Sequence, residues 1–232
     1  MDTVNLISRV NDIKHVGEVI AESLAEMIYS AELKPGQQLP QEDIAHMFGV
    51  SRVPVRDAFQ RLLNMGLVVN VPRRGIIVRP LSKKLLEELY SVREILEGSA
   101  IRIVIKKATP EFIATIEEMA HRHYDVLQNG DIKTGEKLDG EFHRTIFSIT
   151  ANQVLNNLIY SNWVQIKQAR SASRIGVQYG KEWMDNSRAR HKKIIEAIKS
   201  GDEELAYQVV VKNIIDSKQE VFEHLEELGV LE

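Results

Sequence analysis

The stretch QEDIAHMFGVSRVPVRDAFQRLLNMGLVVNVPRRGIIV, residues 41–78, decides the fold of this chain. Apolar residues recur at helical spacing on both sides of Gly49, which predicts two short amphipathic helices joined by a turn. Gly49 can adopt the positive φ that ends the first helix. Ser51 is placed to cap the second helix, and Pro54 falls in its first turn, where a missing N–H costs least. The pattern predicts a helix-turn-helix.

The second predicted helix separates polar from apolar side chains. Arg52, Arg56 and Gln60 fall on one face, away from a stripe that we expect to be buried. Arginine suits contact with DNA because its planar fork can bind guanine edges bidentately or clamp phosphates. In a helix-turn-helix the second helix offers its N-terminal residues to the major groove. We therefore expect this face to read a duplex. The buried stripe consists of Val55, Phe59, Leu62 and Leu63.

After Gly66 the sequence predicts a β-hairpin, or wing. Two short apolar runs, residues 67–69 and 76–78, surround a segment that carries Arg73, Arg74 and Gly75. Phosphate affinity follows the local field, so a basic segment matters even in a chain of net charge −3. A solvated amphipathic helix pair is the alternative, but turn, cap, charge and wing all agree on DNA binding. Against the single acid Asp57, residues 44–80 contain Arg52, Arg56, Arg61, Arg73, Arg74 and Arg79.

The composition is that of an ordinary globular protein. The chain has 232 residues, of which 44% are hydrophobic and 27% charged, enough for two modest domains. Aromatic residues make up 6%, which disfavours a stacking platform for single strands. The absence of cysteine excludes disulfides, thiolate zinc sites and cysteine nucleophiles. No signal-peptide pattern and no long apolar run are present, which predicts a cytoplasmic protein without a membrane partner.

Beyond the wing the pattern becomes helical almost throughout. Only Pro110 remains among the prolines, and strand-like alternation is missing. We therefore predict a mostly α fold, with a winged helix-turn-helix of three helices and a hairpin over residues 1–80, and an all-α bundle over residues 81–232. The first dozen residues are expected to form a loose arm before a helix over residues 16–29. Bundle helices are expected near residues 84–107, 110–128, 131–148, 152–172, 181–199 and 203–228.

Three side chains in the predicted bundle could share one site. Asp139 and His143 lie four residues apart on one helix, so both project from the same face. His191 belongs to a later, partly apolar helix. A carboxylate and two imidazoles from facing helices could hold a divalent metal or an anionic ligand. An Asp–His pair at this spacing is more often a surface hydrogen bond, so spacing alone leaves both interpretations open. His121 and His123 fall on the polar part of their helix and receive no role.

The N-terminal motifs resemble the winged-helix domain of GntR-type bacterial transcription regulators. The resemblance rests on GVSRVPVRDA at residues 49–58, GLV at 66–68 and PRRG at 72–75, and it covers residues 13–79. It implies DNA contacts for a set of residues in the second helix and at the wing tip. At the position of Glu42 some members use an arginine, so that contact should be absent here. The resemblance implies contacts by Ser51, Arg52, Arg56 and Gly75, and the full set of residues predicted to contact DNA adds Pro54, Val55, Gln60, Arg73 and Arg74.

The rest of the chain resembles the FCD domain of FadR-type GntR regulators. The resemblance rests on YSVREILE at residues 90–97 and on the motifs around Asp139, His143 and His191, and it spans residues 84–225. Many FCD domains bind a metal through one Asp and three His, of which this chain matches three. Asn213 stands where the fourth histidine would fall, and an amide oxygen is a poorer ligand than imidazole for zinc or nickel. The resemblance thus implies a divalent metal of the zinc, nickel or manganese type, or a cavity that binds an acid directly.

The resemblance also places an arginine near the effector pocket, at Arg93. A guanidinium in a bundle cavity would suit a carboxylate. The alternative is a salt bridge with Glu97, one helical turn along. Further wall residues of an effector pocket are predicted at Asn152, Gln165 and Arg170.

Together these features predict a ligand-responsive transcription regulator rather than an enzyme. Its expected partners are double-stranded operator DNA, a small organic acid and a second copy of the chain, and its expected role is repression. One alternative is a regulator that senses the metal itself, without an organic effector. The other is a metal-dependent hydrolase with Glu141 or Glu97 as base. No nucleophile elbow, phosphate loop or His-Glu-x-x-His motif supports the hydrolase.

Overall fold

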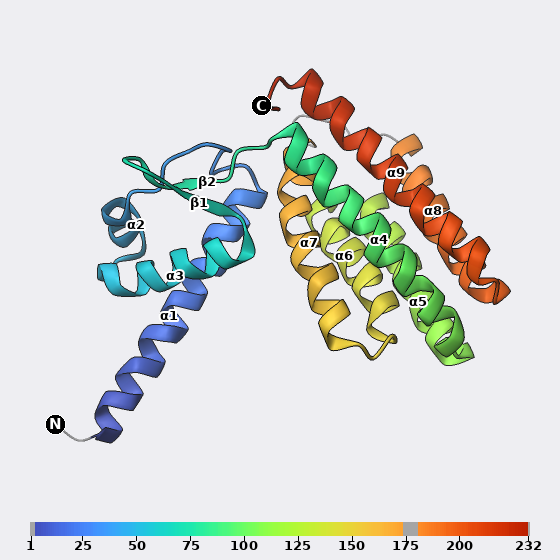
Figure 1. Cartoon of the computed structure of the whole chain (residues 1–232), viewed down its shortest axis with the longest axis horizontal. Helices are drawn as coiled ribbons and strands as arrows, with labels where there is room; N and C mark the ends of the chain where they lie inside the picture. The colour runs from blue at the N-terminus through green and yellow to red at the C-terminus, as the bar shows by residue number, and fades with distance from the viewer. Residues whose placement is uncertain (1–2, 174–180, 232) are drawn as a thin grey trace. The chain divides into compact units, whose positions relative to one another are not determined.

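The computed structural model describes residues 3–173 and 181–231. Within them, helices and one β-hairpin follow one another in the predicted order (Figure 1). The N-terminal elements are α1 (Thr3–Tyr29), α2 (Gln41–Phe48), α3 (Arg52–Met65), β1 (Val68–Val71) and β2 (Gly75–Val78). The later elements are α4 (Lys83–Lys107), α5 (Pro110–Gln128), α6 (Ile132–Ser148), α7 (Gln153–Ala172), α8 (Lys181–Ser200) and α9 (Glu203–Glu227).

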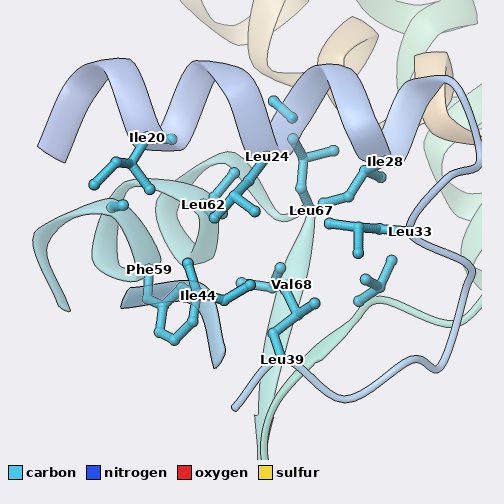
Figure 2. Close-up of a cluster of buried hydrophobic side chains, with 14 of the residues drawn as sticks. Ile20, Leu24, Ile28, Leu33, Leu39, Ile44, Phe59, Leu62, Leu67 and Val68 are labelled. Atoms are coloured by element: carbon cyan, nitrogen blue, oxygen red, sulfur yellow. The ribbon is translucent and has the colours of Figure 1, made fainter. Parts of the chain in front are cut away.

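Buried apolar side chains hold α1, α2, α3 and the wing around one core. Leu24, Leu62, Leu67 and Val68 have no exposed surface. Figure 2 shows Leu24 of α1 and Leu62 of α3 pointing toward each other between the two helices. Burial of each such side chain contributes about 1.5–3 kcal/mol, so this small unit depends on the contact between α1 and α3. The labelled members of the cluster are Ile20, Leu24, Ile28, Leu33, Leu39, Ile44, Phe59, Leu62, Leu67 and Val68.

Two glycines end the paired helices in the left-handed conformation. Gly49 caps α2 with φ 64°, and Gly66 caps α3 with φ 73°. Each donates its backbone N–H to carbonyl groups of the last turn, which would otherwise have no partner. Ser51 is the N-cap residue of α3 in extended conformation, although its side chain makes no capping hydrogen bond. The predicted helix-turn-helix is confirmed.

The wing is held from both sides of β2. β1 pairs with β2 antiparallel, from Val68 opposite Val78 to Val71 opposite Gly75. On the other side of β2, residues 36–39 form a short bridge in which Leu39 N donates to Ile76 O at 2.9 Å. The link between α1 and α2 therefore fixes the position of the wing.

The later helices begin at local signals in the sequence. Thr109 Oγ1 accepts a hydrogen bond from Phe112 N at 3.2 Å, and Pro110 occupies the first turn of α5. Asp131 accepts from Thr134 N at 3.0 Å at the start of α6. α5 lies against both α6 and α8, which brings their inward faces together. The predicted mostly α fold, with a bundle of six helices after the wing, is confirmed.

The chain divides into two compact units. The first comprises Met1–Leu86, Trp163–Ile175 and Val221–Glu232, and the second Glu87–Asn162 and Gly176–Glu220. This division differs from a single boundary after residue 80, because α4, α7 and α9 each contribute residues to both units.

Helix α1 starts earlier than the sequence pattern indicates. It begins at Thr3 instead of near residue 16, so the expected loose arm is wrong for residues 3–12. That segment contains no proline or glycine, and extending an existing helix costs far less than nucleating one. None of the helices in residues 3–173 and 181–231 combines the length and hydropathy of a membrane span.

Candidate nucleic-acid interface and metal centre

The polar face of α3 lies at the surface of the first unit. Ser51, Arg52, Arg56 and Gln60 are exposed. The apolar stripe of the same helix fills the core, which fixes the direction of this face. Pro54 and Val55, which belong to the predicted DNA-contact set, are buried. They support α3 from within and form no part of its exposed surface.

Two of the six arginines of this region are half-buried and form hydrogen bonds within the unit. Arg61 Nε donates to Asp57 at 2.9 Å, and this hydrogen bond raises the pKa of Arg61. Arg79 Nε donates to Gly66 O at 2.5 Å, and burial lowers the pKa of Arg79. The exposed basic surface therefore consists of the other four, which we call the basic face: Arg52, Arg56, Arg73 and Arg74.

The wing tip turns on two residues with positive φ. Arg73 has φ 65° and Gly75 has φ 73°. Arg73, Arg74 and Gly75 are all exposed. The backbone of Arg74 accepts a hydrogen bond from Gln38 Nε2 at 2.6 Å, so the tip is anchored to the α1–α2 link.

A shallow groove runs between α3 and the wing. Its volume is about 380 Å³. Arg56 and Gln60 line it from α3, and Arg74 and Gly75 line it from the wing. Four of the predicted DNA-contact residues thus surround one concave strip, with basic side chains on both walls.

An acid stands beside the basic face. Arg52 Nη2 forms an ion pair with Glu42 Oε1 of α2. Gln41 Nε2 donates to the backbone oxygen of Arg52 at 2.8 Å. The first turn of α2 is therefore tied to the first residue of α3 through both its backbone and its side chain.

In the second unit, the structure brings together the three predicted metal ligands. One ligand atom from each of Asp139, His143 and His191 lies within 4.8 Å of the others. His191 Nε2 lies 3.0 Å from Asp139 Oδ1, and His143 Nε2 lies 3.8 Å from the same oxygen. The three side chains are between 4% and 13% exposed, so they do not form the ordinary surface pair.

The residues at this site fit a divalent cation. A carboxylate with two imidazoles is a donor set that zinc, nickel and manganese accept. The Nδ1 atom of His191 is buried, and nothing among the described residues hydrogen bonds to it. In metal sites the ring nitrogen that does not bind the metal is normally held by an outer-shell group, and no described residue takes that place for His191.

Sequence reasoning missed a third imidazole beside this site. His123 of α5 is only 2% exposed, so its assignment to the polar part of the helix is wrong. Its ring centroid lies 4.8 Å from that of His191 on α8. The ring centroid of Phe142, on α6, lies 4.2 Å from that of His191. The signal was present: Ile116, His123 and Leu127 are spaced by seven and four residues, the register of a buried face.

No described contact joins the remaining predicted effector residues, or the possible fourth metal ligand Asn213, to the three clustered ligands. Arg93 is 2% exposed and its Nε donates to Glu97 Oε1 at 2.6 Å, so the alternative salt bridge is present. Asn152 is exposed at the start of α7, and Asn213 is half-buried on α9. Gln165 lies against Gly66 in the first unit, and the Arg170 guanidinium lies over the Trp163 ring.

Comparison with known families covers both units. The family described as "Bacterial regulatory proteins, gntR family" matches residues 17–78, and the FCD domain matches residues 88–215. The chain is 29% identical over 189 residues to the uncharacterized HTH-type transcriptional regulator YdhC of Bacillus subtilis (strain 168), covering 81% of this chain and 83% of that protein. It is 32% identical over 146 residues to the Nta operon transcriptional regulator of Aminobacter aminovorans, covering 62% and 68%.

A solved structure shares the fold. The E. coli McbR/YncC structure superposes with a TM-score of 0.70 at 21% identity, covering 88% of this chain and 97% of that one. At this identity the likeness concerns the fold alone.

Proposed function

The chain belongs to the GntR family of bacterial regulatory proteins and carries an FCD domain, and from that premise we propose that it is a dimeric, ligand-responsive repressor that works in the cytoplasm. The observation that carries the proposal is the basic face, whose four arginines on α3 and the wing tip are all exposed. Two of them, Arg56 and Arg74, line one groove from its two walls. The matched families and relatives are transcription regulators, not enzymes.

Two copies of the basic face are needed for specific binding. One small module offers few base contacts, and dimers of helix-turn-helix proteins read two half-sites one helical turn apart. A pseudo-palindromic operator is therefore the expected DNA partner. A bound dimer would occlude promoter DNA, which is the basis for proposing repression.

The second unit is proposed to bind a small carboxylate effector through a divalent metal. Asp139, His143 and His191 would hold the metal, with Asn213 or water completing its shell. The metal, when bound, would supply positive charge for the carboxylate. Arg93 would add a second cation only if the acid replaced Glu97 as its partner. The effector needs to favour one conformation by about 1–3 kcal/mol to change DNA affinity 5- to 150-fold.

The decisive experiment removes the two arginines of α3 separately. Arg52→Ala and Arg56→Ala should each weaken retention of a selected operator duplex in a gel shift by about 5- to 150-fold, because a bidentate guanine contact contributes about 1–3 kcal/mol. Both side chains are exposed, so the melting temperature should stay the same. Arg102→Ala in α4, an exposed arginine of the second unit, is the matched control. Undiminished retention in both α3 variants would refute the assignment.

A second function is favoured by the buried ligand cluster itself. The metal alone would act as the signal, without an organic acid. In that case, titrating zinc, nickel or manganese into chelator-treated protein should change operator affinity with no effector present. The effector model instead requires the metal-loaded protein to respond only when a carboxylate is added.

A further inference from the structure

The pair of Glu42 and Arg52 is placed where it can act on DNA recognition but not on folding. The side chain of Arg52 is 64% exposed and that of Glu42 is 69% exposed. Exposed ion pairs contribute about 0–1 kcal/mol to stability. The main effect of the ion pair is therefore to orient the guanidinium of Arg52.

The contact restrains an otherwise mobile side chain. An arginine on a surface samples many rotamers, and it loses that freedom when it binds. The carboxylate of Glu42 holds one edge of the guanidinium, while Gln41 ties the backbone of Arg52 to α2. A guanidinium can present its remaining N–H groups to a guanine edge while one edge stays bound to a carboxylate.

The same carboxylate disfavours contact with phosphates. Non-specific DNA binding comes almost entirely from neutralising phosphates with Lys and Arg. A paired Arg52 must leave Glu42 before it can fully neutralise a phosphate, and the freed carboxylate then lies close to the same negative strand. Binding to a base edge carries a smaller penalty, because bases are neutral and cytosine offers an amino group to a carboxylate.

We propose that Glu42 is a specificity-determining residue, which acts by positioning Arg52 and by lowering the affinity of the basic face for DNA of arbitrary sequence. This inference rests on the proposed DNA-binding function. Glu42 replaces an arginine that contacts DNA in some family members. The inference adds that Glu42 itself influences which DNA sequence is bound.

The chain contains its own matched control in Asp43. Both acids lie in the first turn of α2 and both are exposed, so they affect the helix dipole and the net charge alike. In the described chain, Asp43 makes no ion pair with Arg52. Glu42→Gln and Asp43→Asn therefore remove the same charge from adjacent positions, and only the first alters the partner of Arg52.

The experiment compares selected and arbitrary duplexes. Wild-type protein first selects binders from a pool of random duplexes, and affinity is then measured for the best binder and for a scrambled duplex at several salt concentrations. Glu42→Gln should bind the scrambled duplex about 3- to 10-fold more tightly, with a salt slope steeper by about one, while the gain for the selected duplex is smaller. Asp43→Asn should show less than half of this gain.

Combining the change with Arg52→Ala shows whether Glu42 acts through the arginine. In the Arg52→Ala background, Glu42→Gln should have no more effect than Asp43→Asn. Equal gains for the two single variants, or weaker binding by Glu42→Gln, would overturn the proposal. If wild-type protein enriches no sequence from the pool, the proposed function fails, and this result is distinct from failure of the inference.

Discussion

A buried ion pair one helical turn apart lies inside α4. Arg93 and Glu97 are each 2% exposed at the side chain. Removing one member of a buried ion pair leaves the other charge in the protein interior without the opposite charge that stabilised it most. We expect Glu97→Ala to lower the free energy of unfolding by about 3–5 kcal/mol, measured by urea denaturation.

An exposed pair of the same spacing is the control for this change. Lys192 and Glu196 on α8 are separated by 3.6 Å, with side chains 73% and 60% exposed. Glu196→Ala should cost less than about 1 kcal/mol. If both alanine variants lost the same stability, burial would not be the cause.

At the residue scale, spacing predicted which side chains could meet but not whether they would be buried. Asp139 and His143 were expected on one face, and His191 was expected on a facing helix. Their proximity is confirmed. The i, i+4 spacing of Arg93 and Glu97 permitted either a salt bridge or a ligand site, because burial depends on distant segments. For the same reason His123 was misjudged, since the polar residues around it concealed its apolar register.

At the scale of elements, the turn between α2 and α3 depends on the conformation of one residue. Gly49 has φ 64°, and no heavy atom beyond its chain neighbours lies within 4 Å of where a Cβ would be. Gly49→Ala is therefore strained by its backbone alone. It should lower the free energy of unfolding by about 1–2 kcal/mol, measured by thermal or urea denaturation.

The same substitution in a helix should have the opposite sign. Gly140 lies within α6 with open space at its Cβ position and without positive φ. Gly140→Ala should raise stability by about 0.5–1 kcal/mol, because alanine loses less conformational freedom in a helix. A gain for Gly49→Ala would contradict the assigned role of the turn.

Most elements could be predicted because their signals are local. The glycines at 49 and 66, the proline at 110 and the cap at Thr109 define ends that the structure confirms. The bridge between residues 36–39 and β2 could not be predicted, because it pairs segments far apart in sequence. The early start of α1 was missed because its first dozen residues were interpreted as polar, although Leu6, Val10 and Ile13 keep helical spacing.

At the scale of the whole molecule, metal binding should be coupled to folding. A ligand that binds only the native state stabilises it by RT ln(1 + [L]/Kd), about 2.7 kcal/mol at a hundredfold excess over Kd. Zinc, nickel or manganese added to chelator-treated protein should therefore raise the melting temperature. His191→Ala should abolish the shift, measured by scanning calorimetry.

His121→Ala is the matched control for the metal experiment. His121 belongs to α5 but is exposed. Its removal should leave the metal-induced shift unchanged. An equal loss in both variants would indicate binding of metal to surface histidines instead of the buried cluster.

The larger organisation was only partly open to sequence reasoning. A change in composition after residue 80 predicted two parts of different character, and family matches on either side of that point agree. The compact units nevertheless share α4, α7 and α9. A long helix has one sequence pattern along its length, so the pattern does not reveal that its two ends pack in different groups.

The strand-like segment at residues 36–39 also affects how copies of this protein meet one another. An uncovered strand edge is a template on which a second molecule can build intermolecular β-structure. This segment occupies one edge of β2, and so closes one of the routes by which the hairpin could seed aggregates. Because residues 36–39 cover this edge, no charged side chains are needed there to prevent pairing with another chain. The wing-tip arginines are therefore available to contact nucleic acid.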